Sequence, residues 1–270
     1  MEKTKLRVAA VQAIGTDDPA QNARHMERFF KQAKKKRVEV ICFPEGYLSF
    51  YDLTKLQNPE PQYANAIRDA VRKARDLASQ YGMWTVVGTL IPGSAKWRNV
   101  AYLLTPDGRI RGTYDKIHTL EGRERDALEE GQKLPTFRID GVRVGLQICN
   151  DQKYFEGWAA LAQKGCDVVF HPMWGNGDRG LNLYENGAQM CRAWENGMFV
   201  VTANAISPDP KKTQFALSQI IGPDGRPLAR AKPDVETLLV ADLDIEQARQ
   251  LRKRQLNARR TSLFNLKSQL

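Results

Sequence analysis

The sequence predicts an α/β protein in which two mixed β-sheets pack face to face and helices cover their outer sides. Short apolar stretches typical of buried strands alternate with segments whose apolar residues have helical spacing. Three pairs of strand-like segments flank turn signals, so we expect antiparallel hairpins, which exclude an all-parallel sheet. Roughly ten to twelve strands are expected, and a sheet of that size usually splits into two packed layers.

The expected strands are rich in small, β-branched and aromatic residues. They lie at residues 6–13, 38–43, 83–90, 98–105, 109–114, 134–139, 142–148, 167–171, 198–203, 215–221, 227–231 and 236–243. Three turns lead from one strand to the next within hairpins. They are Pro106-Asp107-Gly108, Asp140-Gly141 and Gly222-Pro223-Asp224-Gly225.

The expected helices place apolar residues three and four positions apart. They lie at residues 18–36, 62–81, 154–164, 183–196 and 245–256. The chain contains no internal repeat, low-complexity segment or stretch that resembles a linker. We therefore expect one domain that covers residues 1–270.

The composition is that of a globular protein with a large core. The chain has 270 residues, of which 42% are hydrophobic. It contains no apolar run near the roughly 18–20 residues that span a bilayer, and its start lacks the features of a signal peptide. These observations predict a cytoplasmic protein that does not associate with membranes.

The net charge of +10, from 41 basic and 31 acidic residues, raises the possibility of nucleic-acid binding. The basic residues cluster at the end of a predicted helix, at residues 34–37, and in the C-terminal stretch. They form no basic platform interleaved with aromatic residues. Solvated helix faces, together with a subunit contact, explain the charge better than a nucleic-acid partner does.

Four cysteines are present, at positions 42, 149, 166 and 191. They show neither a C-x-x-C pair nor the Cys and His spacing of a zinc site. We therefore expect free thiols.

Three segments place a reactive side chain directly after a strand. Glu45 follows residues 38–43, Lys116 follows residues 109–114, and Cys149 follows residues 142–148. Strand ends above a rigid sheet are where α/β proteins present functional groups. Each residue alone also has a structural interpretation: a core thiol for Cys149, a helix-capping carboxylate for Glu45 and a surface amine for Lys116.

A catalytic thiol needs a base, because a thiol with a pKa of about 8.5 is mostly protonated at neutral pH. The chain offers three histidines, His25, His118 and His171, and local sequence favours none of them. Glu45 is the other candidate, because its apolar neighbours can raise its pKa by burial. A Cys/His pair and a Cys/Glu pair therefore both stay open from the residues alone.

Five segments, taken in order, resemble the nitrilase superfamily of carbon–nitrogen hydrolases. They are VAAVQ at residues 8–12, ICFPEGYL around Glu45, YDKIH around Lys116, GVRVGLQICND at residues 141–151 with the following YFEGWAALAQKGCDVV, and CRAWENGMFVVTAN at residues 191–204. The resemblance covers essentially the whole chain.

The resemblance implies a four-layer αββα sandwich that pairs into a homodimer or a larger homo-oligomer. It also implies a catalytic triad of Glu45, Lys116 and Cys149, and a second active-site glutamate shortly before a Leu-x-x-Gly stretch. Leu128-Glu129-Glu130-Gly131 supplies that stretch and points to Glu124, with Glu121 as the competitor.

These roles suggest a mechanism. Glu45 takes the proton of Cys149, the thiolate attacks a carbonyl carbon, and Lys116 with the backbone N–H of Asn150 holds the oxyanion. Water, oriented by Glu45 and Glu124, then hydrolyses the thioester. This mechanism implies that no metal ion or organic cofactor is needed.

The residues after the nucleophile indicate the substrate class. The family's true nitrilases usually read Cys-Trp-Glu here, whereas this chain reads Cys149-Asn150-Asp151, as in the amidase and carbamoylase branches. Some carbamoyl-amino-acid hydrolases continue with two arginines that bind a carboxylate. This chain has Gln152 and Lys153, so that role is in doubt, although Lys153 supplies one positive contact. We expect a small amide or N-carbamoyl substrate.

Further side chains are candidates for the substrate pocket. Trp174 and Asn176 follow the strand at residues 167–171, although an ordinary loop explains them equally well. Tyr47 and Tyr154 are candidate pocket walls, with core packing as the alternative for Tyr154.

Three rival functions remain at the level of sequence. A nitrile-cleaving enzyme on the same scaffold is the main alternative. An amide-transfer module fed by glutamine would need a second, synthetase domain, for which the chain is too short. A non-enzymatic nucleic-acid-binding protein is the third.

Overall fold

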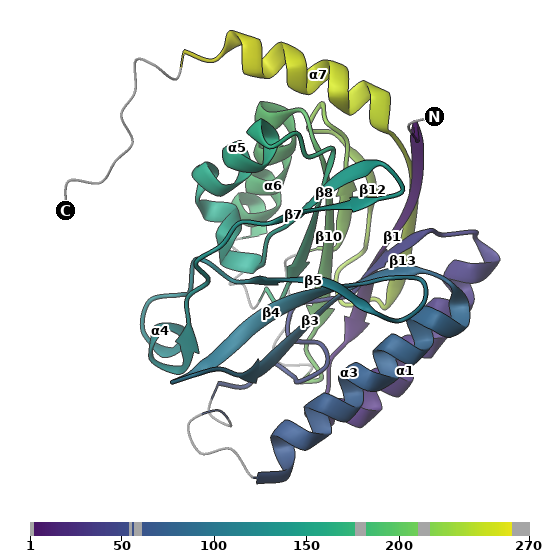
Figure 1. Ribbon diagram of the computed structural model, residues 1–270, viewed down its shortest axis with the longest axis vertical. Helices are drawn as coiled ribbons and strands as arrows, with labels where there is room; N and C mark the ends of the chain where they lie inside the picture. The colour runs from purple at the N-terminus through teal and green to yellow at the C-terminus, as the bar shows by residue number, and fades with distance from the viewer. Residues whose placement is uncertain (1–2, 54–55, 57–60, 176–181, 210–216, 261–270) are drawn as a thin grey trace.

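The computed structural model describes residues 3–53, 56, 61–175, 182–209 and 217–260 (Figure 1). Strands and helices alternate along the first part of the chain, and hairpins interrupt this alternation in the middle and near the end. This order explains why the sheet is mixed, because a hairpin makes antiparallel neighbours and a helical crossover makes parallel ones.

Thirteen strands are present in the described part of the chain. They are β1 (Lys5–Ile14), β2 (Val40–Cys42), β3 (Trp84–Pro92), β4 (Trp97–Leu104), β5 (Ile110–Asp115), β6 (Leu128–Glu129), β7 (Thr136–Ile139), β8 (Val142–Leu146), β9 (Val168–Met173), β10 (Phe199–Ile206), β11 (Gln219–Ile221), β12 (Pro227–Arg230) and β13 (Thr237–Asp244).

The helices flank the sheet or connect its strands. They are α1 (Pro19–Lys35), α3 (Pro61–Tyr81), α4 (Arg123–Ala127), the 3-10 helix η1 (Cys149–Lys153), α5 (Phe155–Gln163), α6 (Asn182–Asn196) and α7 (Ile245–Ala258).

The strands form one connected mixed sheet with the order β5-β4-β3-β2-β1-β10-β9-β8-β7. The partners β6, β11, β12 and β13 pair beside this path. The centre is parallel, from β3 through β2 to β1 and from β10 through β9 to β8. The link between β1 and β10 consists of two residue pairs, Ala13 with Ala205 and Ile14 with Ile206. The strands on the β1 side and those on the β10 side are therefore joined at one short seam.

Strand β1 shows how the core is divided. Leu6, Val8 and Ala10 belong to a core that strands from both sides of the seam share. The alternate residues of β1, such as Ala9 and Val11, pack against α1 and α3 instead. Successive strand residues point to opposite faces, so this continuous apolar run fills two cores at once.

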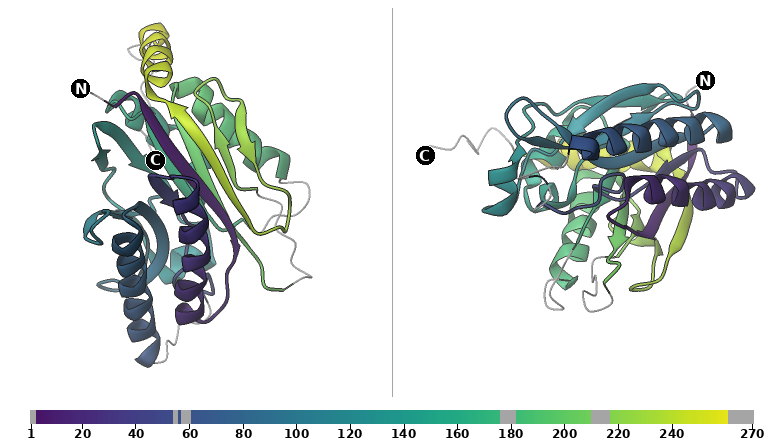
Figure 2. Two further views of the ribbon diagram at one scale, coloured as in Figure 1. Left: turned by 90° about the vertical axis from the view of Figure 1, so that its right-hand side faces the viewer. Right: turned by 90° about the horizontal axis from the view of Figure 1, so that it is seen from below.

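Helices cover the sheet on two sides. α1 and α3 lie side by side on one side of the molecule, and α5 and α6 lie on another (Figures 1 and 2). Trp158 and Leu161 of α5 and Ala193 of α6 pack against Val169 of β9 and Val200 of β10. Each helix therefore buries its apolar stripe against a strand face, as the spacing in the sequence predicts.

The α/β class with a mixed sheet and covering helices is confirmed. The three predicted hairpins are also present, as β4–β5, β7–β8 and β11–β12. Asp140 and Gly141 both have positive φ, at 48° and 89°, as the turn between β7 and β8 requires. The sequence did not predict α4, β6 and η1, which are too short to show a period.

Candidate active site

Strand ends bring the predicted triad residues to one place. Glu45 follows β2 after two residues, Lys116 follows β5 directly, and Cys149 follows β8 after two residues. The Lys116 Nζ donates a hydrogen bond to Glu45 Oε1 at 3.1 Å. Cys149 lies close enough that a thiolate there raises the pKa of Lys116. Residues more than 30 positions apart in the sequence therefore meet at one buried site.

Lys116 is a fully buried ammonium group between two carboxylates. Its Nζ also donates to Glu124 Oε2 at 2.9 Å and to Oε1 at 3.1 Å. Burial opposes the charge, but attraction from the carboxylates, Glu45 foremost, outweighs it and raises the pKa of Lys116 well above its usual range. The amine therefore keeps its positive charge at neutral pH and can stabilise a developing negative charge.

Glu45 is held at both carboxylate oxygens. Oε1 accepts a hydrogen bond from Asn99 Nδ2 at 2.7 Å, and Oε2 accepts one from the backbone N–H of Trp174 at 2.8 Å. Burial raises the pKa of Glu45, and the repulsion of Glu124 adds to this, although Lys116 opposes it. A carboxylate with a raised pKa is a better base, so the environment suits Glu45 to proton transfer.

The second glutamate near Lys116 is Glu124, on the short helix α4. Its Oε2 accepts the backbone N–H of Leu120 at 2.7 Å, and its Oε1 accepts the hydroxyl of Tyr51. The ring of Tyr51 also lies 5.7 Å from Lys116 Nζ. Glu121, the competing candidate, is exposed to solvent. The structure therefore places Glu124, and not Glu121, beside the lysine.

Cys149 begins η1 with a positive φ of 43°, which is uncommon for a residue other than glycine. Asp151 stabilises this turn, because its Oδ2 accepts the backbone N–H of Ile148 at 2.9 Å and the hydroxyl of Tyr114 at 2.7 Å. Its Oδ1 accepts the backbone N–H of His118 at 2.9 Å. Asp151 therefore ties the cysteine turn to the loop that carries Lys116.

The three histidines have different surroundings. His25 contacts Tyr47 and Glu236, and the His118 Nδ1 lies 2.8 Å from Asp151. His171 is fully buried, and its Nε2 lies 3.2 Å from the carbonyl oxygen of Cys149. Burial lowers the pKa of His171 to about 4. An imidazole with that pKa is a weak base at neutral pH, and its described contact is to the backbone of Cys149. Both observations favour Glu45 over His171 as the base.

The residues predicted to bind substrate have separate locations. Trp174 is buried beside Glu45, and its ring stacks on Tyr51 with centroids 6.2 Å apart. The side chain of Asn150 is buried and donates to the carbonyl oxygens of His118 and Thr119 at 3.2 and 3.4 Å. Both residues therefore frame the site.

Lys153 and Tyr154 lie at the surface end of η1. Lys153 is exposed, and Tyr154 is 41% exposed with its ring stacked on His118 at 4.0 Å. Their contact with a substrate stays a prediction. Asn176 lies outside the described residues.

The placement of Tyr47 contradicts its prediction as a pocket wall. Its side chain is fully buried in the core beneath α1 and α3, where its ring stacks on Phe43. Its hydroxyl lies 3.1 Å from His25 Nδ1 on α1. The turn after Glu45 sends Tyr47 to the helix side of the sheet and brings Tyr51 to Glu124.

Sequence reasoning missed Tyr51, Asn99 and the anchoring role of Asp151. Tyr51 carries no distinguishing signal, because its position depends on a turn in which Gly46 and Phe50 both have positive φ. Asn99 lies inside β4, where it takes one place in the run of alternate buried positions that Trp97, Ala101 and Leu103 otherwise fill. A polar residue that breaks such a run is the signal that could have identified it.

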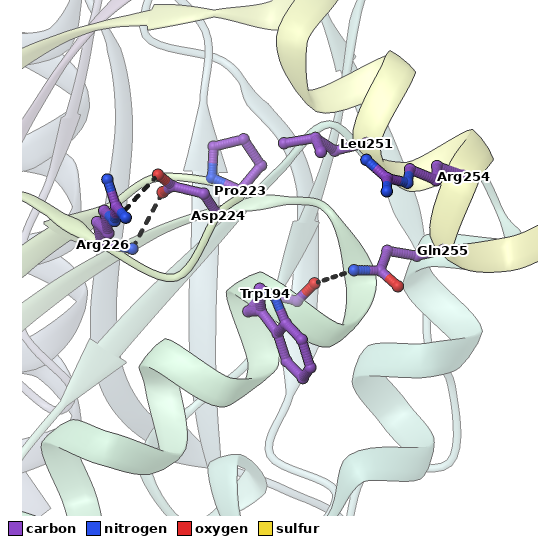
Figure 3. Close-up of a pocket in the computed structure, with 7 residues that line it drawn as sticks. All are labelled: Trp194, Pro223, Asp224, Arg226, Leu251, Arg254 and Gln255. Carbon is purple, nitrogen blue, oxygen red and sulfur yellow. Dashed lines mark hydrogen bonds and ion pairs between the residues drawn. The ribbon is translucent and has the colours of Figure 1, made fainter. Parts of the chain in front are cut away.

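A cavity of about 490 Å³ lies away from this site, between α6, α7 and the turn from β11 to β12 (Figure 3). It is lined by Trp194, Pro223, Asp224, Arg226, Leu251, Arg254 and Gln255. These side chains include none of the residues around Lys116, so this cavity is not the candidate active site.

The described residues contain no group of three or more Cys, His, Asp or Glu side chains that could hold a metal ion. Glu45 and Glu124 instead surround an ammonium group. In the same described segments, no helix is both long enough and apolar enough to cross a membrane.

A sequence profile of the carbon–nitrogen hydrolase family matches residues 7–253. The chain therefore belongs to the carbon–nitrogen hydrolases. Among its relatives, the omega-amidase NIT2 of Xenopus tropicalis is 26% identical over 276 residues, which cover 98% of this chain and 97% of the relative. A nitrilase of Pyrococcus abyssi is 29% identical over 245 residues, with 89% and 90% covered.

Solved structures share the fold at lower identity. A carbon–nitrogen hydrolase from Helicobacter pylori G27 superposes with a TM-score of 0.86 at 21% identity, covering 98% of this chain and 99% of that one. A variant of an amidase from Nesterenkonia sp. AN1 superposes with a TM-score of 0.82 at 22% identity, covering 96% and 95%. That structure shows covalent addition of the acetamide moiety of fluoroacetamide at the active-site cysteine.

Proposed function

We propose that this protein hydrolyses the carbon–nitrogen bond of a small amide or N-carbamoyl compound through a thioester on Cys149. The observation that carries the proposal is the buried Lys116 ammonium, held between Glu45 and Glu124 and close to Cys149. An ammonium fixed at this place suits the stabilisation of an oxyanion. The relatives named omega-amidase and amidase support an amide as substrate.

In the first half of the proposed reaction, Glu45 takes the proton of the Cys149 thiol. The thiolate attacks the carbonyl carbon, and the C=O π electrons move to the oxygen. Lys116 and the backbone N–H of Asn150 stabilise this negative charge. Glu45 then gives its proton to the leaving nitrogen, the carbon–nitrogen bond breaks, and the amine or ammonia departs. The acyl group remains on Cys149 as a thioester.

In the second half, water replaces the departed amine. Glu45 takes a proton from the water, and the hydroxide attacks the thioester carbon at the same oxyanion site. The carbon–sulfur bond then breaks, the cysteine sulfur recovers the proton from Glu45, and the acid is released. Glu124 holds the Lys116 ammonium and helps to orient the water. The cycle consumes one water and needs no metal ion or organic cofactor.

The side chains after Cys149 favour a plain amide over a carbamoyl amino acid. Gln152 is buried and accepts a hydrogen bond from Gln189 at 3.0 Å, so it is engaged inside the protein. Lys153 is exposed. These two residues do not form the paired cationic contact that a substrate carboxylate prefers. A free carboxylate on the substrate would need a cation from elsewhere.

A nitrile is the second candidate substrate. The relative in Pyrococcus abyssi is named a nitrilase. Thiolate addition to a nitrile carbon gives a thioimidate, and water converts it to the thioester with loss of ammonia. The acid is then released as for an amide. Because both substrates end at the same thioester, the panel of substrates must distinguish them.

The test is ammonia release from aliphatic amides, ω-amides, carbamoyl amines and nitriles. We expect release from at least one amide, and a mass increase equal to the acyl group on Cys149. Cys149→Ala should lose turnover by at least about 1000-fold, because no other group replaces the nucleophile. Cys191→Ala changes an exposed cysteine and serves as the matched control. Full turnover by Cys149→Ala would overturn the proposal.

We also propose that the two strand groups and their helices form a four-layer αββα sandwich within one domain of residues 1–270. The shared core between strands on both sides of the seam supports this arrangement. We further propose a cytoplasmic homodimer or larger homo-oligomer with no nucleic-acid partner. Phe155 and Trp194, which are 42% and 58% exposed, give α5 and α6 an apolar outer face that suits self-association. The mass in solution, measured by light scattering, tests the assembly.

A further inference from the structure

We propose that His171 is a positioning residue that orients the peptide bond between Cys149 and Asn150, so that its N–H points at the oxyanion. This inference rests on the proposed function, because it concerns the Asn150 N–H that the reaction needs. It starts from one contact, in which the His171 Nε2 lies 3.2 Å from the carbonyl oxygen of Cys149.

The direction of this hydrogen bond follows from its acceptor. A carbonyl oxygen can only accept, so the His171 Nε2 must carry the proton. The imidazole is fully buried, and burial lowers its pKa to about 4. At neutral pH the ring is therefore neutral, with the Nε2–H donated to Cys149 and the lone pair on Nδ1.

The planar peptide bond transmits this contact to the active site. The carbonyl of Cys149 and the N–H of Asn150 belong to one peptide group, and in a trans peptide they point in opposite directions. Because His171 holds the oxygen, it also fixes the direction of the N–H. A donor at the carbonyl polarises the amide as well, which strengthens the N–H as a donor.

The backbone at Cys149 needs such an anchor. Its φ of 43° lies in a region that costs energy for a residue other than glycine and persists only where neighbouring groups stabilise it. Asp151 holds the turn through the N–H of Ile148, on the side before Cys149. His171 holds it on the side after Cys149. The peptide that follows the nucleophile is thus fixed by a group outside the turn.

The imidazole is itself held in place. His171 lies on β9 and pairs in register with Thr202 on β10, whose Oγ1 is 3.3 Å from His171 Nδ1. The ring of Trp158 on α5 packs edge-on against the imidazole at 5.5 Å. Both strands lie in the parallel centre of the sheet, so the donor sits on a rigid support.

The alternative role is that of a base for the thiol. The described contact is to the carbonyl oxygen of Cys149, and a pKa of about 4 leaves little basicity at neutral pH. The two roles predict different effects on the thiol. A base would lower the apparent pKa of Cys149 alkylation, whereas a group that orients the peptide would leave this pKa nearly unchanged.

The experiment compares His171→Gln, whose side-chain amide can donate near the Nε2 position, with His171→Met, which has similar bulk and no donor. Turnover of the best amide, the affinity for the matching aldehyde, and the pH dependence of Cys149 alkylation by iodoacetamide are measured on the full chain. The aldehyde adds to the thiol and places an oxygen at the oxyanion position. It therefore reports on the N–H directly.

We expect His171→Met to lower kcat by about 10- to 100-fold, somewhat less than the loss of an oxyanion donor itself, with KM within about threefold. Aldehyde affinity should fall by a similar factor, while the midpoint of alkylation changes little. His171→Gln should retain kcat within about fivefold. If His171→Met does not fold, His171→Asn replaces it, because its shorter amide does not reach the Cys149 oxygen.

Three results would overturn the inference. The first is an equal loss of kcat in His171→Gln and in the variants without a donor at the Nε2 position. The second is an unchanged kcat in all of these His171 variants. The third is a midpoint of Cys149 alkylation that rises by one pH unit or more in His171→Met. Turnover by Cys149→Ala would remove the proposed function and this inference together. Loss of turnover in Cys149→Ala, with no effect of His171 variants, would remove this inference alone.

Discussion

Lys116 and its two carboxylates form a cluster of three ionisable side chains that are almost completely buried. Such a cluster is stable when each charge has a partner, because an unpaired buried charge costs several kcal/mol. Because Lys116 would lose two carboxylate partners if it moved, its ammonium stays fixed while a substrate enters. The same ion pair keeps Glu45 close to Lys116. Glu124 remains the counterion of the ammonium when Glu45 takes up a proton.

This arrangement predicts different outcomes for the two neighbouring glutamates. Glu124→Gln should lower kcat by roughly 100-fold, because it removes a charge that holds Lys116 and replaces one acceptor with a donor. Glu121→Gln, which changes an exposed side chain in the same loop, is the matched control and should stay within about twofold. Steady-state kinetics on the best amide measures both. Equal effects of the two changes would contradict the role of Glu124.

The sequence was informative for some residues of the site and not for others. Glu45, Lys116 and Cys149 could be selected because each follows a strand in a segment that resembles one family. Tyr47 and Tyr51 could not be assigned, because both are aromatic residues of one turn. Positive φ at Gly46 and Phe50 decides which of them faces Lys116. Such backbone reversals depend on packing that no local pattern records.

At the scale of elements, the site depends on close backbone approach between β3 and the turn that carries Glu45. Gly88 of β3 donates its N–H to the carbonyl of Pro44 at 3.2 Å. A Cβ on Gly88 would lie 2.5 Å from that oxygen and 2.6 Å from the Cα of Glu45. Backbone atoms cannot move aside as a flexible side chain can, so the absence of a Cβ at position 88 sets the position of Glu45.

Gly88→Ala should therefore move Glu45 and lower kcat by about tenfold or more, because small displacements of a catalytic group are costly. We expect it to lower the free energy of unfolding by about 1–3 kcal/mol. Gly187→Ala in α6 is the control, because a Cβ there meets no atom of the described residues within 4 Å and alanine favours a helix. Urea unfolding and kinetics measure both variants. An active, fully stable Gly88→Ala protein would refute the explanation.

Element boundaries followed the apolar pattern closely where the pattern was long. The expected helix at residues 62–81 is α3 (Pro61–Tyr81), and the expected strand at residues 6–13 is β1 (Lys5–Ile14). The helix α4, which carries Glu124, was not predicted, because five residues do not complete two helical turns. Its position depends instead on the contacts of Glu124 with Lys116 and with the N–H of Leu120.

At the scale of the whole molecule, the two strand groups meet through the shared core and the short pairing of β1 with β10. A mixed α/β sheet could be predicted from local patterns, since hairpins and crossovers are visible in the sequence. The seam could not, because it pairs residues about 190 positions apart through a backbone contact that leaves no compositional signal. The site lies where loops from both strand groups meet, so its geometry depends on this long-range packing.

Whole-molecule stability should depend on pH through His171. Its folded-state pKa of about 4 lies below the ordinary value of 6.5, because burial disfavours the charged ring. As the pH falls from 6.5 to 4, the unfolded chain binds a proton that the folded chain does not, so the free energy of unfolding decreases. The slope reaches about 1.4 kcal/mol per pH unit, and the total loss approaches about 3 kcal/mol.

We expect this loss to be absent when the histidine is replaced. Between pH 7 and pH 4.5, the wild-type protein should lose about 2–3 kcal/mol more unfolding free energy than His171→Gln, as measured by urea unfolding at each pH. The comparison uses the change within each protein, so a constant cost of the substitution cancels. Equal losses in the wild type and His171→Gln would mean that His171 becomes protonated in the folded protein as readily as in the unfolded chain, and that its burial does not control the acid stability of the molecule.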